Sequence, residues 1–251
     1  MFIQICRIIE LGGTIMLEII NVSKSYGQKK ANDQITLTIE PGDIYGFVGH
    51  NGAGKTTLLK AIAGIIDFEE GDILVLGKSV KKDPLGVKRE IAYIPDNPDI
   101  YESLSGIQYL NFIADAFLVS AIERKELIEK YATMFELSDV LSHPISSYSH
   151  GMKQKLVIIS ALVHKPKVLL LDEPFVGLDP KASFLLKDTF RHLCEAGASI
   201  FFSTHVLEVV EKLCNKVAII KQGKIVAQGM THEVVKDQSL ETLFMEIASE
   251  H

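Results

Sequence analysis

The chain has 251 residues and a mass of 27.8 kDa, enough for one large α/β domain or two small ones. Its formal net charge of -6 and isoelectric point of about 5.8 argue against a nucleic-acid partner, because nucleic-acid-binding proteins of this size usually carry a basic face. Its three cysteines are dispersed without CxxC spacing, which disfavours a disulfide framework or a zinc site, and no apolar run approaches the roughly 20 residues that span a bilayer.

The first fifteen residues carry no pattern typical of a folded element. Arg7 and Glu10 interrupt their apolar start and no cleavage-site pattern follows, so they make a poor signal peptide. The Gly12-Gly13 pair can be encoded by a bacterial ribosome-binding sequence at a suitable distance from Met16. Two interpretations stay open: residues 1–15 are a misassigned start, or they form a genuine disordered tail.

Short strands and a turn are predicted from Met16 onward. Residues 17–22 and 35–39 alternate between apolar and polar side chains, as half-buried strands do. Pro41-Gly42-Asp43 marks a turn, and residues 44–48 form a short apolar strand that leads directly into a glycine-rich loop.

That loop matches the pattern G-x-x-x-x-G-K-[ST] between a strand and a helical run. The glycines allow successive backbone N–H groups to point at a phosphate, and the helix N-terminus adds the positive end of its dipole. Lys55 would reach the β- and γ-phosphates and Thr56 would ligate Mg²⁺, whereas the alternative is an ordinary glycine turn. The candidate nucleotide-binding residues here are Gly49, His50, Asn51, Gly52, Ala53, Gly54, Lys55, Thr56 and Thr57.

The middle of the chain changes to helical spacing. Ser105 and Gln108 form a capping box that opens a helix with apolar residues at helical intervals up to Phe117. A second apolar stripe covers residues 127–135, so we interpret residues 96–160 as a helical lobe inserted into an α/β core.

Two acids follow a continuously apolar strand at residues 168–171. Ligands bind at the carboxyl ends of strands in α/β sheets, and adjacent strand residues point to opposite sides, so the two acids can have different roles. Asp172 would hold Mg²⁺, and Glu173 would polarise the attacking water. A pair of acids after a strand is also common in ordinary loops.

The remaining elements are predicted to be a strand at 198–202, a hairpin of residues 217–220 and 224–227, and a C-terminal helix with an apolar stripe over residues 239–247.

Together with the phosphate loop and the acidic pair, the segment Tyr148-Ser149-His150-Gly151-Met152-Lys153-Gln154 resembles an ABC-family nucleotide-binding domain, over residues 17–229. By this resemblance Ser149 and Gly151 belong to the signature motif, which contacts the γ-phosphate held by the opposite subunit. Asp179 resembles part of the loop after the catalytic acid, His205 the switch histidine, and Tyr26 the aromatic residue that stacks on adenine.

The resemblance implies an α/β fold: a P-loop NTPase with a RecA-like core, an inserted α-helical subdomain and a small antiparallel β part. Residues 16–235 would form the nucleotide-binding domain, and residues 236–251 would add a C-terminal helix. The catalytic residues would be Glu173, His205 and Lys55, and the metal ligands would be Thr56, Asp96 and Asp172.

The resemblance further implies an ATPase with ATP and Mg²⁺ as cofactors, a homodimer around ATP, and a separate polytopic membrane subunit. Such a protein would be cytoplasmic and peripheral on the inner face of the membrane. Two departures, His150 in place of a glycine and Asp96 in place of a glutamine, resemble the branch that exports drugs, peptides and bacteriocins. The alternative is an ABC ATPase without a transported substrate, such as an iron–sulfur assembly ATPase.

Overall fold

The computed structural model describes residues 15–97, 100–236 and 238–249. Both interpretations of the N-terminal extension therefore concern residues that lie almost wholly outside the described part of the chain. Within that part, none of the helices combines the length and the apolar character that a membrane span requires.

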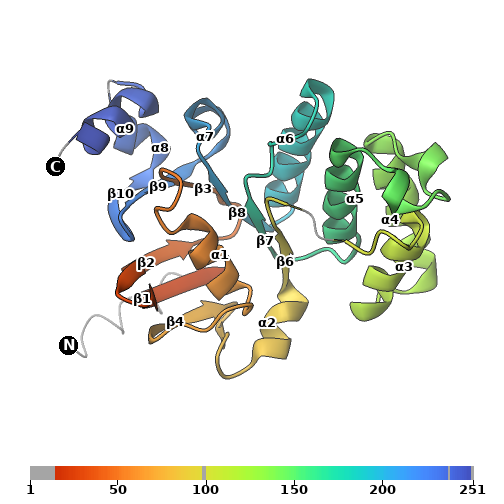
Figure 1. The fold of residues 1–251 in the computed structure, drawn as a ribbon, viewed down its shortest axis with the longest axis horizontal. Coiled ribbons are helices and arrows are strands. Elements are labelled where there is room, and N and C mark those ends of the chain that lie inside the picture. Colours follow the sequence, from red (N-terminus) through yellow and green to blue (C-terminus); the bar gives the residue numbers. More distant parts are fainter. Residues whose placement is uncertain (1–14, 98–99, 237, 250–251) are drawn as a thin grey trace.

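Two β-sheets form the framework of the molecule (Figure 1). The smaller sheet is antiparallel, and its strands follow the order β2 (Lys29–Ile39), β1 (Leu17–Tyr26), β4 (Glu70–Val75) and β5 (Lys78–Ser79). The larger sheet has the order β10 (Lys224–Met230), β9 (Lys216–Lys221), β3 (Ile44–Val48), β8 (Ser199–Thr204), β7 (Val168–Asp172) and β6 (Ile91–Ile94). It is parallel except for β10, which pairs with β9 as the predicted hairpin.

The central strands of the parallel sheet are buried on both faces, as their unbroken apolar sequences predict. Alternate residues of β3 enter two different hydrophobic clusters: Ile44 and Val48 join one, and Tyr45 and Phe47 join the other. The first cluster lies against the helical side of the chain, and the second fills the space toward the antiparallel sheet. The strands that carry these loops are therefore packed by one hydrophobic cluster on each face of the sheet.

The helices occupy the remaining faces. They are α1 (Lys55–Ile62), α2 (Pro84–Glu90), α3 (Gly106–Ala116), α4 (Ala121–Met134), α5 (His150–Val163), α6 (Pro180–Glu195), α7 (Leu207–Leu213), α8 (Thr231–Val235) and α9 (Leu240–Ser249), with short 3-10 turns η1 (Ser138–Val140) and η2 (Ile145–Ser147). Figure 1 shows α3, α4 and α5 together at one end of the molecule, and α8 and α9 beside β10 at the other.

Local sequence signals explain where the helices of the middle segment begin. The Ser105–Gln108 capping box is present at α3, with both reciprocal hydrogen bonds formed. Ser120 caps α4 by accepting a hydrogen bond from the backbone of Glu123. The predicted capping box and helices are confirmed at this level, whereas the domain boundaries assigned from the sequence stay predictions.

Candidate functional site

The glycine-rich loop connects β3 to α1, and its last glycine makes the sharp turn possible. Gly54 is the N-cap of α1, with a φ of 113°. A Cβ atom built there would lie 2.1 Å from the backbone oxygen of Ala31. Only glycine combines this left-handed conformation with such a close approach, so the turn requires Gly54.

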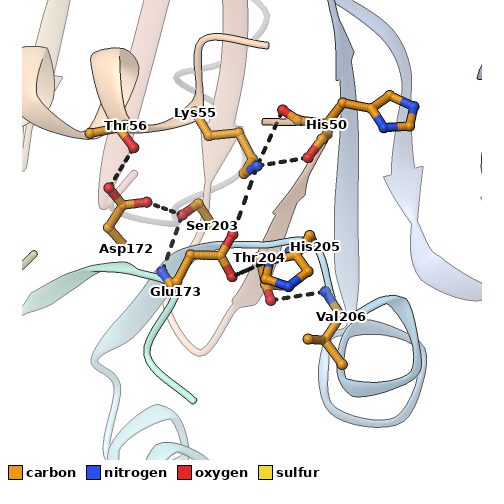
Figure 2. Close-up of polar contacts among 10 residues, drawn as sticks. His50, Lys55, Thr56, Asp172, Glu173, Ser203, Thr204, His205 and Val206 are labelled. Carbon is orange, nitrogen blue, oxygen red and sulfur yellow. Dashed lines mark hydrogen bonds and ion pairs between the residues drawn. The ribbon is translucent and has the colours of Figure 1, made fainter. Parts of the chain in front are cut away.

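Lys55 is buried at the start of α1, where its ammonium group points back into the loop (Figure 2). It donates to the carbonyl oxygens of Gly49 and His50, at 2.7 and 3.4 Å. Burial lowers the pKa of Lys55, while the carboxylates of Glu173 and Asp172 act in the opposite direction. A buried ammonium group beside loop N–H groups provides an anion-binding site.

Asp172 at the end of β7 joins three elements that are distant in the sequence. Its Oδ2 accepts a hydrogen bond from the hydroxyl of Thr56 at 2.6 Å, and its Oδ1 accepts one from Ser203 at the end of β8. The three side chains converge in Figure 2. This arrangement places two oxygen ligands for a hard cation side by side, in the positions predicted for Thr56 and Asp172.

Glu173 lies between the lysine and the histidine. Its carboxylate is 3.8 Å from Nζ of Lys55 through Oε1, and 3.0 Å from Nδ1 of His205 through Oε2 (Figure 2). Its φ of 49° is in the left-handed region, and its backbone N–H donates to the carbonyl oxygen of Ser203 at 3.1 Å. Strained backbone of this kind costs about 1–3 kcal/mol and persists where surrounding contacts enforce it. In this conformation the Glu173 carboxylate lies toward His205.

A pocket of about 450 Å³ opens between these groups and the antiparallel sheet. Its lining residues are Tyr26, Lys29, Ala31, Asn51, Gly52, Gly54, Lys55, Thr56, Thr57, Asp96, Asp172 and Glu173. Gly49, His50 and Ala53 belong to the same loop but not to this lining. The pocket thus combines an anion-binding loop with three carboxylates.

Asp96, after β6, faces the same pocket as Asp172 and Glu173. Burial raises the pKa of Asp96, and the negative charges of those two acids raise it further. A cation in the pocket would relieve this repulsion. Asp96 thus lines the same pocket as the other predicted metal ligands, Thr56 and Asp172, and its role as a ligand stays a prediction.

The residues assigned to the signature motif lie elsewhere. Ser149 is the N-cap of α5 and accepts a hydrogen bond from the backbone of Met152 at 3.3 Å. Gly151 packs against the backbone of Gly177, since a Cβ atom built at Gly151 would lie 3.0 Å from the Gly177 oxygen. Neither Ser149 nor Gly151 lines the pocket around Lys55. Within one copy of the chain, the signature residues Ser149 and Gly151 therefore do not lie at the pocket around Lys55.

Asp179 and Tyr26 occupy peripheral positions. Asp179 is the N-cap of α6 and pairs with Lys155 at 2.8 Å, and this hydrogen-bonded pair lowers the pKa of Asp179. Tyr26 ends β1 with 54% of its surface exposed, and it lines the pocket beside the phosphate loop. An exposed ring in this place can stack on a flat ligand.

The side chains fit a magnesium ion that binds together with phosphates. Mg²⁺ is usually held by one or two carboxylates and by substrate phosphates, not by a cage of protein ligands alone. Thr56, Asp172 and Asp96 supply oxygen donors in one pocket. Within the ranges that the structure describes, no cluster of three or more His, Cys, Asp or Glu side chains could hold a metal by itself.

Two supporting residues were not among the sequence-based candidates. Ser203 bonds both Asp172 and the backbone of Glu173. Asn32 is fully buried in β2 and donates to the carbonyl oxygen of Gly54 at 3.1 Å. For Ser203 the available signal was a polar residue in a strand that is buried throughout, whereas Asn32 lies among polar, partly exposed residues of β2 and carried no such signal.

Known proteins resemble this chain in sequence and in fold. Residues 32–176 match the family described as ABC transporter. The ABC-type transporter ATP-binding protein EcsA of Bacillus subtilis (strain 168) is 32% identical over 240 residues, which cover 94% of this chain and 97% of that protein. The Nod factor export ATP-binding protein I of Sinorhizobium fredii (strain NBRC 101917 / NGR234) is 32% identical over 224 residues, 89% of this chain and 65% of that protein.

A solved structure of an ATP-binding subunit of an ABC transporter superposes on this chain with a TM-score of 0.90. It is 31% identical in sequence, and the match covers 93% of this chain and 100% of that chain. The predicted fold class, a P-loop NTPase of α/β type, is confirmed by this likeness.

Proposed function

Because this chain belongs to the ABC transporter ATP-binding proteins, an ATPase family, we propose that two copies of it close around ATP and power export through a separate membrane subunit. The observation that carries the proposal is the convergence of Lys55, Asp172 and Glu173 on one pocket, with His205 paired to Glu173 at 3.0 Å, while the signature residues lie outside that pocket. Export is supported by the similarity to a relative named for Nod factor export.

The pocket residues and His205 divide the chemistry of ATP hydrolysis among them. Lys55 and the loop amides hold the phosphates, and Tyr26 stacks on the base. Glu173 accepts the proton of the attacking water, and His205 holds that carboxylate in place at 3.0 Å. Mg²⁺, held by Thr56, Asp172 and Asp96, supplies charge neutralisation on the phosphate oxygens when bound.

A second copy completes each site. Ser149 and Gly151 stand at the N-terminus of α5, where backbone N–H groups and the helix dipole favour a negative charge. We assign them to the γ-phosphate held by the opposite copy, with Asp179 at the same interface. A two-fold, head-to-tail arrangement then forms two equivalent sites, and ATP shifts the population toward the closed dimer because it contacts both copies.

An apolar groove of about 360 Å³ supports a membrane partner. It lies between β6 and the helices α3 and α5, and its lining includes Ile100 and Phe117. Two buried polar atoms in the lining, Oη of Tyr93 and Nδ1 of His164, have no hydrogen-bond partner in the described part of the chain. A partner segment with apolar side chains would cover the apolar lining of this groove.

Exposed aromatic residues extend the same surface. Tyr101 has 60% of its surface exposed and packs edge-on against Phe112, with 5.7 Å between ring centroids. Through such a contact the protein would be cytoplasmic and peripheral on the inner face of the cell membrane. Co-purification of a polytopic membrane protein tests this assignment, and a complete absence of such a partner would favour the iron–sulfur assembly alternative.

The variant Glu173→Gln tests the catalytic assignment directly. It should keep ATP binding but slow hydrolysis by roughly a hundred- to ten-thousand-fold, the range for losing a general base. It should also trap an ATP-bound dimer, detected by size-exclusion chromatography. Glu208→Gln, at an exposed acid of α7 that pairs with Lys212, is the matched control and should behave like the unmodified chain. A fully active, monomeric Glu173→Gln protein would contradict both the base and the dimer.

A further inference from the structure

The C-terminal helix α9 lies against two segments of the nucleotide site at once. Its first residue, Leu240, is fully buried and donates its backbone N–H to Oε2 of Glu211 at 3.0 Å. Glu211 belongs to α7, the helix that follows His205 directly. This end of α9 is therefore anchored on the segment that carries the histidine.

The other half of α9 contacts the phosphate loop. The Phe244 ring packs on the imidazole of His50, with 4.6 Å between centroids and 48° between planes. The backbone oxygen of Ile247 accepts a hydrogen bond from Nζ of Lys221, at the end of β9, at 2.6 Å. In Figure 2 the His50 ring points away from Lys55 and Glu173, so the side chain that α9 holds is not one that faces the pocket.

His50 connects that contact to the groups that hold phosphate. Its backbone oxygen accepts from Nζ of Lys55 at 3.4 Å and from the backbone N–H of Ala53 at 3.1 Å. The side chain of His50 is thus fixed from outside the loop, and its backbone orients groups inside the loop. Fixing the loop before ATP arrives reduces the ordering cost of binding.

We propose that α9 is a strap that preorganises the nucleotide site, and that Phe244 is a positioning residue for ATP that acts through His50. The proposal rests on the function proposed above, since it assumes that the loop binds ATP. Because α9 contacts both the phosphate loop and α7, it also holds the loop and the His205 segment in a fixed position relative to each other.

The contact sets the expected size of the effect. An aromatic pair of this geometry changes affinity by about 2- to 10-fold if its whole contribution is coupled to the bound loop. Coupling is reciprocal, so ATP must stabilise the docked position of α9 by the same factor. A purely structural contact would not respond to the nucleotide.

Equilibrium titration with a fluorescent ATP analogue tests the positioning role on the full chain. Phe244→Ala should weaken binding about 2- to 10-fold. Phe244→Tyr keeps the ring and should restore the affinity of the unmodified chain. Met245→Ala is the matched control, since Met245 is the neighbouring residue of α9, has 62% of its surface exposed, and should not change binding.

A double-variant comparison separates coupling from general damage. His50→Ala and Phe244→Ala should each weaken binding, and the double variant should be no weaker than the poorer single variant. Multiplied losses would overturn the proposal, as would unchanged binding by Phe244→Ala. If the unmodified chain does not bind the analogue, both the proposed function and the role of the strap are refuted. If the unmodified chain binds it and Phe244→Ala binds it equally well, only the role of the strap is refuted.

Hydrogen exchange on the unmodified chain requires no variant. Saturating ATP should slow the exchange of the amides at residues 243–247 by the same 2- to 10-fold factor. Exchange of these amides that does not change with ATP would overturn the proposal even if Phe244→Ala fails to fold.

Discussion

His164 makes the free energy of unfolding depend on pH between pH 6.5 and about pH 4. It is the C-cap of α5, and its ring stacks on Phe117 with 3.7 Å between centroids and 8° between planes. Burial lowers the pKa of His164 to about 4, from an ordinary value of 6.5. The folded protein therefore favours the uncharged form of the His164 ring. The substitution His164→Phe tests this assignment.

The sign follows from proton binding in the two states. Between pH 6.5 and pH 4 the unfolded chain holds a proton on this residue and the folded chain does not, so lowering the pH favours unfolding. The shift of pKa makes this contribution absent at pH 7.5 and about 2 kcal/mol at pH 5, on the destabilising side. Below pH 4 both states are protonated and the loss no longer grows.

Urea unfolding at pH 7.5 and pH 5 measures the effect. His164→Phe keeps an aromatic ring against Phe117 but removes the titrating nitrogen, so its free energy of unfolding should fall by about 2 kcal/mol less than that of the unmodified chain over this interval. The comparison of differences cancels the carboxylates that titrate in both proteins. Equal losses in the two proteins would refute the assignment of a buried, uncharged His164.

Two substitutions in the pocket address the assigned roles of its charges. Lys55→Ala should remove most of the ATP affinity, because a charge-assisted phosphate contact is lost inside a preformed anion site, and a fluorescent nucleotide titration with unchanged affinity would speak against the phosphate loop. Asp96→Ala should leave nucleotide binding nearly intact, lower the basal ATPase rate modestly, and abolish stimulation by the membrane subunit. ATPase assays with and without that subunit across a Mg²⁺ titration check this, and unchanged stimulation with an unchanged Mg²⁺ midpoint would mean that Asp96 serves only as a loop residue.

The sequence by itself determined the elements whose cause is local. The Ser105–Gln108 capping box needs only a spacing of three residues, and it opens α3 as predicted. The apolar run before Asp172 is a buried strand because both faces of its sheet are covered. The phosphate loop likewise follows from the spacing of its glycines between a strand and a helix. Periodicity and capping depend on residues only a few positions apart, so they can be predicted from the sequence alone.

Only the tertiary structure decided how distant residues meet. The sequence analysis assigned Thr56 and Asp172 to one Mg²⁺ site, but their 2.6 Å hydrogen bond across 116 positions exists because β3 and β7 both end at the same edge of the sheet with β8 between them. The same order of strands brings Ser203 to Asp172. Likewise, the apolar stripe of α9 predicted a helix but not its contact with His50, because a stripe specifies that a face is buried and not what covers it. Strand order and helix docking depend on the packing of the whole chain, which no local pattern encodes.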